Sequence, residues 1–252
     1  MTPQQVKKLD LDASNLTAYS YTEGRVGYLQ INCNRVTDEN VRKALLFAMD
    51  RKAMDDAAFE SDEYYSIPYT FLPTNSQFYT EDGVEKYEQD VDKAKSMLEE
   101  AGVSGLKLKL GYISSDAVQS AQALLIQEQL KEVGVTVELA GGDGTAIANA
   151  MKDPDNEYDM YLGGYIMGID PDTFSSLFEN DGAYNYMHYS GYDTIDQLFE
   201  EGRSELDESA RKETYAKLQA AVQDTGAFYP IISNNKIPVS YTHLTLPTIL
   251  RV

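Results

Sequence analysis

The residues best placed to bind a ligand lie in YLGGYIMGIDPDTFSSLF, residues 161 to 178. A predicted strand ends there in two glycines and is followed by Tyr165, Ile166 and Met167. In α/β proteins ligands dock beyond the carboxyl ends of strands, so these three side chains are candidates for ligand contact. Asp170 is a fourth candidate, but Asp-Pro-Asp is also typical of a helix start, in which Asp170 would be the cap.

A second group of candidates surrounds one of the two histidines. His188 stands in a stretch that also holds Tyr184, Tyr186, Tyr189 and Tyr192. A histidine can bind a metal, but a single one is also common as a packed or surface residue. Tyrosines suit a core and the wall of a cleft equally well. Tyr186 and His188 are therefore candidate ligand contacts.

Motifs typical of enzymes do not occur in the sequence. His188 and His243 share no metal-ligand spacing, and there is neither a P-loop nor a Gly-x-Ser-x-Gly elbow. The GGDG at 141–144 lacks the rest of a dinucleotide fingerprint and is interpreted as a turn. Cys33 is the single cysteine and is expected as a small apolar residue. These features predict a binding protein without catalytic residues, metal or cofactor; the alternative is a hydrolase that uses carboxylates near residue 170.

Alternating strands and helices are predicted to position these candidates. Strands are expected at 26–33, 106–113, 135–139, 158–165 and 227–232, and helices at 38–59, 90–101, 116–133, 145–152, 171–178, 193–204 and 208–224. The aromatic, proline-bearing stretch 64–79 is expected to be a packed loop. Because a helix links the strands at 106–113 and 135–139, these two strands should be parallel. The pattern predicts an α/β fold.

Composition narrows the classes of partner. The chain has 252 residues, of which 42% are hydrophobic and 25% charged, as in ordinary globular proteins. Its formal charge of −20 argues against nucleic acid, which is bound by clustered Lys and Arg. No run of 18 apolar residues occurs, and MTPQQVKKLDLDAS lacks the apolar region of an export signal. As written, the chain would stay in the cytosol.

Five motifs in a fixed order carry a resemblance to a known family. They are VRKALxxAMDR, DxxKAKSMLEEAG, LKEVGVTV, YDMYLGGYxxxxDPD and YSGY. From about residue 28 to about residue 237 the chain resembles the extracytoplasmic solute-binding proteins of ABC importers, in the family that binds oligopeptides, dipeptides and nickel complexes. The resemblance implies the second lobe of a two-lobed, periplasmic-binding-protein-like fold, with a mixed sheet and flanking helices.

The resemblance also implies a division of the chain. Residues 1–31 would be a remnant of the first lobe, 32–237 the second ligand-binding lobe, and 238–252 a tail that is not native. The stretch VSYTHLTLPT, at 239–248, is similar to a sequencing adaptor translated in one frame. Its alternation of strand formers and polar residues leaves a genuine edge strand as the alternative.

The function implied by the resemblance is capture of a solute between two lobes. Closure about a hinge would enclose an oligopeptide or dipeptide and present it to the permease subunits of the importer. The full-length protein would be a monomer outside the cytoplasm, held to the membrane only by a lipid anchor that this sequence does not carry. Tyr165 would line the cleft, and Ile166 and Met167 would face side-chain pockets. Peptide-binding relatives often pair an Asp after that aromatic with the peptide ammonium, but here no carboxylate precedes Asp170, so another solute such as a nickel complex stays open.

Overall fold

The structure is a computed structural model that describes residues 6, 8–9, 16–59, 62–166, 168, 170–189, 193–237 and 239–241. The strands are β1 (Leu16–Ala18), β2 (Tyr21–Thr22), β3 (Arg25–Ile31), β4 (Tyr65–Ser66), β5 (Lys107–Ile113), β6 (Thr136–Gly142), β7 (Met160–Ile166), β8 (Phe228–Lys236) and β9 (Val239–Tyr241). The α-helices are α2 (Glu39–Phe47), α3 (Arg51–Phe59), α4 (Val91–Glu100), α5 (Ala117–Glu132), α6 (Gly144–Met151), α7 (Ser175–Phe178), α8 (Asp193–Ser204) and α9 (Glu208–Asp224). Two short 3₁₀ helices span Asp62–Tyr64 and Pro171–Phe174.

A seven-stranded sheet forms the centre of the fold. Six of its strands lie in the order β2-β8-β3-β7-β5-β6, and β4 pairs with β8. Strand β5 is parallel to β6 and to β7, whereas β3 is antiparallel to both of its neighbours. The mixed sheet and the parallel pair joined by α5 confirm the predictions made from the sequence.

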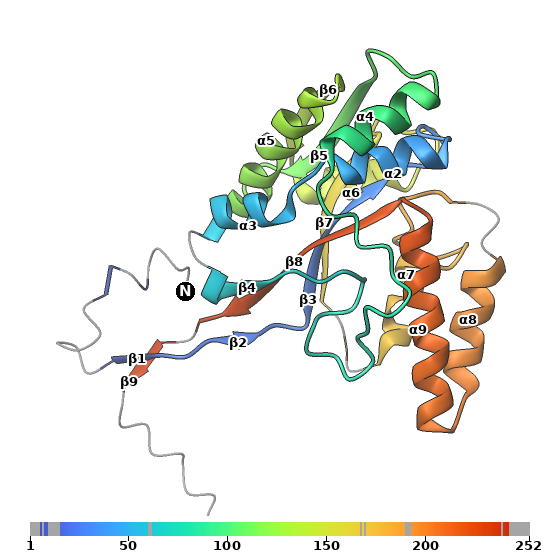
Figure 1. Cartoon of the computed structure of the whole chain (residues 1–252). Coiled ribbons are helices and arrows are strands. Elements are labelled where there is room, and N and C mark those ends of the chain that lie inside the picture. The colour runs from blue at the N-terminus through green and yellow to red at the C-terminus, as the bar shows by residue number, and fades with distance from the viewer. Residues whose placement is uncertain are drawn as a thin grey trace, which may run out of the picture.

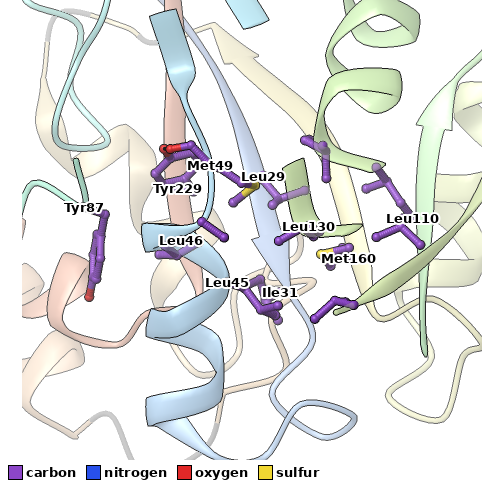
Figure 2. Packing of buried hydrophobic residues seen from close by; sticks show 14 of the residues in the cluster. Leu29, Ile31, Leu45, Leu46, Met49, Tyr87, Leu110, Leu130, Met160 and Tyr229 are labelled. Carbon is purple, nitrogen blue, oxygen red and sulfur yellow. The ribbon is translucent and has the colours of Figure 1, made fainter. Parts of the chain in front are cut away.

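Helices cover both faces of the sheet (Figure 1). On one face the strands pack against α2, α3, α4 and α5, and Figure 2 shows part of this core, including Leu29 and Ile31 of β3. On the other face lies a second cluster with side chains from α7, α8 and α9, and Tyr28 of β3 belongs to it. Successive residues of a strand point to opposite faces, so β3 contributes to both cores. None of the described helices combines the length and apolar composition that crossing a membrane requires.

Several helix boundaries agree with the capping signals in the sequence. Asp90 and Asp116 accept hydrogen bonds from backbone N–H groups in the first turns of α4 and α5. Gly102 and Gly134, which follow these helices, have φ angles of +68° and +80°. Only glycine adopts such angles at little cost, so each glycine ends its helix.

The helix expected at 38–59 is in fact two helices. Helix α2 ends at Phe47 and α3 begins at Arg51. Between them, the backbone N–H of Asp50 donates to Oε1 of Gln129, and Oδ1 of Asp50 accepts from the N–H of Ala53. Asp50 thus caps a new helix and is held there by α5.

Two further elements differ from the sequence-based expectation. In GGDG, Gly141 and Gly142 are the last residues of β6, Asp143 caps α6 and Gly144 is its first residue, so the motif is a strand end and a helix start. The helix expected at 171–178 is a 3₁₀ turn, Pro171–Phe174, followed by the short α7. The stretch 64–79 is a packed loop as predicted except for the short strand β4, and Phe71 and Phe78 are buried in the second cluster.

The tail begins with a strand that lies apart from the main sheet. Strand β9 pairs antiparallel with β1, from Leu16 with Tyr241 to Ala18 with Val239, as a separate two-stranded sheet (Figure 1). Residues 242–252, which include most of the adaptor-like stretch, lie outside the described residues. The division at residues 31 and 238 stays a prediction; β3, which precedes the first of these boundaries, lies in the middle of the sheet.

Deleting residues 239–252 is expected to leave the midpoint of thermal unfolding within about 2 °C of the intact chain, because an isolated two-stranded pair contributes little stability. Differential scanning calorimetry of both forms measures this change. A fall of many degrees would show that the tail is integral to the fold.

Candidate functional site

The carboxyl end of β7 carries two of the predicted ligand contacts. Ile166, the last residue of the strand, is 65% exposed. The half-buried Tyr165 has its hydroxyl 3.1 Å from Oγ of Ser176 and its ring 5.5 Å from that of Phe174. Met167, the third apolar candidate, lies outside the described residues. Tyr165 is therefore fixed by α7 and its preceding turn, while Ile166 is free to contact a partner.

Five tyrosines lie along one face of β3 and β7 and in the segment that packs there, and we call them the tyrosine cluster: Tyr28, Tyr161, Tyr165, Tyr184 and Tyr186. The rings of four of them form a chain of contacts, with centroids 6.1 Å apart from Tyr165 to Tyr184, 6.4 Å from Tyr184 to Tyr186 and 5.7 Å from Tyr186 to Tyr161. Tyr184 is 45% exposed, whereas Tyr186 is buried. The cluster thus runs from the interior to the surface, with the geometry of an aromatic wall.

Glycines under the aromatic rings make this arrangement possible. A Cβ at Gly163 would lie 2.7 Å from the ring of Tyr28 and 3.0 Å from that of Tyr161. A Cβ at Gly164 would collide with Nη2 of Arg25, which is on the adjacent strand. At the end of β6, a Cβ at Gly141 would lie 2.7 Å from the ring of Tyr112. Long side chains therefore lie flat on the backbone at this edge of the sheet.

Three hydroxyls of the cluster, those of Tyr28, Tyr161 and Tyr186, are neutral and have no partner in the described residues. Burial raises the pKa of Tyr28, Tyr161 and Tyr186, and the hydroxyls of Tyr161 and Tyr186 add to the rise at Tyr28. Within the described part of the chain, none of these three hydroxyls has a hydrogen-bond partner. The cluster therefore offers hydrogen-bonding groups that a ligand can use.

A buried amide lies on the same face of the sheet. Gln30 is two residues after Tyr28 on β3 and pairs across the strands with Tyr161. It is fully buried, and neither Nε2 nor Oε1 has a partner among the described residues. Unpaired buried amides are costly, so a water or a ligand group is expected to satisfy this one.

The carboxylate of Asp170 is bound by neighbouring residues of the same chain. Its Oδ1 accepts from the N–H of Asp172 at 3.0 Å, and both carboxylate oxygens accept from Nη2 of Arg211, at 2.8 and 2.6 Å. Burial alone would raise the pKa of Asp170, but these hydrogen bonds outweigh it and the pKa is lowered. A hydrolase acid requires the opposite shift. Helix capping is confirmed, and the ligand contact of Asp170 stays a prediction.

The side chain of His188 is also bound by a neighbouring residue of the same chain. Its Nε2 donates to the carbonyl of Met151 at 2.7 Å, and its backbone has a φ of +47°, which is uncommon for a residue other than glycine. Among the described residues, no three His, Cys, Asp or Glu side chains gather where they could hold a metal ion. His188 as a ligand contact therefore stays a prediction, and so does Tyr186.

Sequence reasoning missed Tyr28 and Tyr161. The signal that would have found them is the register of β3 against β7, which pairs Tyr28 with Gly163 and Gln30 with Tyr161. Alternation along each strand then places Tyr28 and Tyr161 on the face that also carries Tyr165. Cys33 agrees with its prediction, because it packs against the second cluster and burial raises its thiol pKa to about 11.

Comparisons with known proteins identify the family to which the chain belongs. Residues 1–186 match the profile of the bacterial extracellular solute-binding proteins, family 5 (middle). The oligopeptide-binding protein AppA of Bacillus subtilis is 26% identical over 234 residues, which cover 83% of this chain and 42% of AppA. The nickel-binding periplasmic protein of Escherichia coli is 24% identical over 81% of this chain and 41% of its own length.

A solved structure is similar over nearly the whole chain. The ABC transporter substrate-binding protein CtaP of Listeria monocytogenes superimposes with a TM-score of 0.89 and 37% identity, over 96% of this chain and 50% of CtaP. The chain thus spans about half the length of its relatives. The matched family consists of solute-binding proteins, not of enzymes. The chain belongs to the bacterial extracellular solute-binding proteins of family 5.

Proposed function

We propose that this chain is the second lobe of the solute-binding component of an ABC importer, and that the complete protein captures oligopeptides or dipeptides between two lobes. The tyrosine cluster carries this proposal. With Tyr165 it reaches the carboxyl end of β7, where α/β folds receive ligands, and three of its hydroxyls have no partner in the described residues. Tyr165 and Ile166 would face the solute, and Met167 would line a pocket beside them.

The printed names of relatives support peptides as the solute. AppA of Bacillus subtilis is named an oligopeptide-binding protein, and a relative in Escherichia coli, 26% identical over 79% of this chain, a dipeptide-binding protein. An aromatic wall with hydroxyl groups suits a peptide, whose backbone supplies both donors and acceptors. The complete protein would work outside the cytoplasm, as a monomer that docks on permease subunits and reaches the membrane through a lipid anchor.

A nickel complex is the second candidate solute. A relative in Escherichia coli is named a nickel-binding protein, and His188 lies next to Tyr186 of the cluster. Because Nε2 of His188 donates to a carbonyl, only Nδ1 is left to approach a complex. A carboxylate-dependent hydrolase has less support, because Arg211 and Arg203 hold the carboxylates of Asp170 and Asp172.

The isolated chain is expected to bind peptides with a Kd in the millimolar range or weaker, equivalent to about 4 kcal/mol, because one lobe offers only part of the contacts and cannot close. Titration of tri-alanine and a mixed peptide library, followed by NMR of ¹³C-labelled tyrosine rings, measures this affinity. Tyr165→Ala should weaken or abolish what binding remains, and in the complete protein should cost ~2 kcal/mol or more.

Tyr64→Ala provides the control, because Tyr64 is a partly buried tyrosine outside the cluster, beside β4. Micromolar binding by the isolated chain would contradict the proposal that this chain supplies only one of two lobes that enclose the solute. If Tyr165→Ala and Tyr64→Ala behaved alike, the cluster would not be the binding wall. Shifts confined to the ring of Tyr64 would place the ligand elsewhere.

A further inference from the structure

A pocket lies away from the tyrosine cluster, on the other face of the sheet. It has a volume of about 370 Å³ and is bounded by the junction of α2 and α3, the segment after β4 and the segment before α4. Met49 and Tyr87 of its wall belong to the core between the sheet and helices α2 to α5, whereas Tyr28 of the tyrosine cluster belongs to the core on the opposite face. The volume is in the range of small-molecule pockets.

Arg51 brings a buried positive charge to this pocket. Its side chain is 4% exposed, and its Cζ lies 4.5 Å from the ring centroid of Tyr69 and 4.9 Å from that of Tyr229. Nη1 donates to the carbonyl of Pro68 at 3.4 Å, and Nη2 donates to the carbonyl of Lys86. Nε has no acceptor in the described part of the chain, although an arginine carries five N–H donors. Arg51 can therefore still donate to a ligand in the pocket that it lines.

Two carboxylates line the same pocket nearer to the solvent. Oε1 of Glu88 is 4.0 Å from Nη2 of Arg51, which is too long for a hydrogen bond, and it accepts from the hydroxyl of Tyr69 at 2.6 Å. The side chain of Glu88 is 67% exposed. Oδ1 of the partly buried Asp50 caps α3. The second oxygens of both carboxylates have no partner among the described residues, so they can accept from a ligand.

The order of these charges selects the kind of ligand. Lys52, the other cation of the lining, directs its ammonium to Asp56. An anion at Arg51 would be repelled by Glu88 and Asp50, and a cation at these carboxylates would be repelled by Arg51. A ligand that carries both charges is attracted at both ends. The two charges of an α-amino acid are separated by one carbon atom, which suits an arginine and a glutamate whose charged atoms are 4.0 Å apart.

We propose that this pocket is a second ligand site, which takes the zwitterion of a free α-amino acid. The carboxylate of the amino acid accepts from Nε of Arg51, and its ammonium donates to Glu88 and Asp50 at the rim. Its side chain lies against the rings of Tyr69 and Tyr87. The site goes beyond the proposed function, because residues of this chain alone line it and no second lobe is needed to complete it.

The first experiment titrates L-alanine into the intact chain at pH 7, beside N-acetyl-L-alanine and L-alaninamide, each of which keeps only one of the two charges. NMR of ¹³C-labelled tyrosine rings locates binding: Tyr69 and Tyr87 report on the pocket, and Tyr165 and Tyr184 report on the tyrosine cluster. Alanine should saturate the signals of Tyr69 and Tyr87 at least about fivefold more tightly than either blocked form, because each blocked form loses a charge-assisted bond. Binding no tighter than that of the blocked forms, or shifts confined to Tyr165 and Tyr184, would overturn the proposal.

Glu88→Gln tests the contact with the ammonium. Glutamine keeps an oxygen for the hydroxyl of Tyr69, and the side chain is largely exposed, so the fold should not change. The advantage of alanine over N-acetylalanine should fall close to one. Glu85→Gln is the matched control, since it removes the same charge from an exposed residue of the same segment that does not line the pocket. If Glu88→Gln kept the full advantage, or if both variants lost it equally, the site would be wrong.

Arg51→Met tests the contact with the carboxylate and should remove the advantage of alanine over alaninamide. Arg51→Lys should restore part of it, because the charge returns without the planar fork. Arg51 also holds two carbonyls, so thermal unfolding accompanies these measurements, and if Arg51→Met unfolds, Glu88→Gln and the three ligands decide the question. Alanine bound at the pocket without any peptide at the tyrosine cluster would contradict the proposed peptide function and support this second site.

Discussion

Replacing Arg42 by methionine is expected to lower the free energy of unfolding by about 3 kcal/mol, because buried carbonyl groups would lose their donor. Arg42, on α2, is 3% exposed. Its Nη1 donates to the carbonyls of Val36 and Thr37, and its Nε and Nη2 both donate to the carbonyl of Thr225, at the end of α9. Methionine would fill the space but leave three carbonyls without their donor.

Urea unfolding of both proteins at pH 7 measures this loss, and the melting temperature should fall by about 6–12 °C. Lys43→Met is the control on the same helix. Nζ of Lys43 forms ion pairs with Glu39 and Asp224 at the surface, and such pairs contribute less than about 1 kcal/mol. A loss for Arg42→Met no larger than for Lys43→Met would show that water replaces the guanidinium at these carbonyls.

Asp55→Asn is expected to stabilise the protein at pH 8, by about 2–5 kcal/mol, and to change little at pH 4. Asp55 is fully buried on α3; its Oδ1 accepts from Nε2 of Gln122 at 3.2 Å, and Oδ2 has no partner in the described part of the chain. Burial raises the pKa of this carboxyl to about 8, and Asp56 and Asp50 add to the rise. Hydrogen bonding by Gln122 and the charge of Arg51 oppose it.

The direction of the pH dependence follows from this shift. Between about pH 4 and pH 8 the folded chain binds a proton at Asp55 that the unfolded chain has released, so stability falls as the pH rises through this window. Asparagine stays neutral, and its advantage grows over the same window. Urea unfolding of the wild type and the variant at pH 5 and pH 8 tests this, and an equal effect at both values would contradict it.

Asp56→Asn is the matched control for Asp55. The two residues are adjacent on α3, but the carboxylate of Asp56 accepts from Nζ of Lys52 and from the hydroxyl of Tyr65, and its pKa is lowered. Stability contributed by a lowered pKa is present above the unfolded value and is lost in acid. Asp56→Asn should therefore lose a little stability at pH 8 and gain none.

Local signals in the sequence were sufficient for most of the fold. The helices at 193–204 and 208–224 lie where their periodicity placed them, and the caps at Asp90 and Asp116 mark real helix starts. The break between α2 and α3 could not be predicted in this way. It depends on a hydrogen bond from Asp50 to Gln129, and no pattern within the helix reports a partner so far along the chain.

The candidate site was predictable only in part, for the same reason. Tyr165 and Ile166 were found because a strand, two glycines and an aromatic residue stand in one short stretch. Tyr28 and Tyr161 join them through the register of β3 against β7, which is a property of the folded sheet. Asp170 illustrates the reverse: its motif suggested both a cap and a ligand contact, and Arg211, from a later helix, occupies its carboxylate.

The glycine beneath the aromatic rings is a position at which a single substitution would change the shape of the tyrosine cluster. Gly163 supports the rings of Tyr28 and Tyr161. One nucleotide substitution in a glycine codon gives alanine, whose methyl group would tilt the side chain above it while every ligand-facing residue keeps its identity. Under the proposed function, substitution at Gly163 would alter the preferred solute in small steps, without the loss of a tyrosine from the cluster.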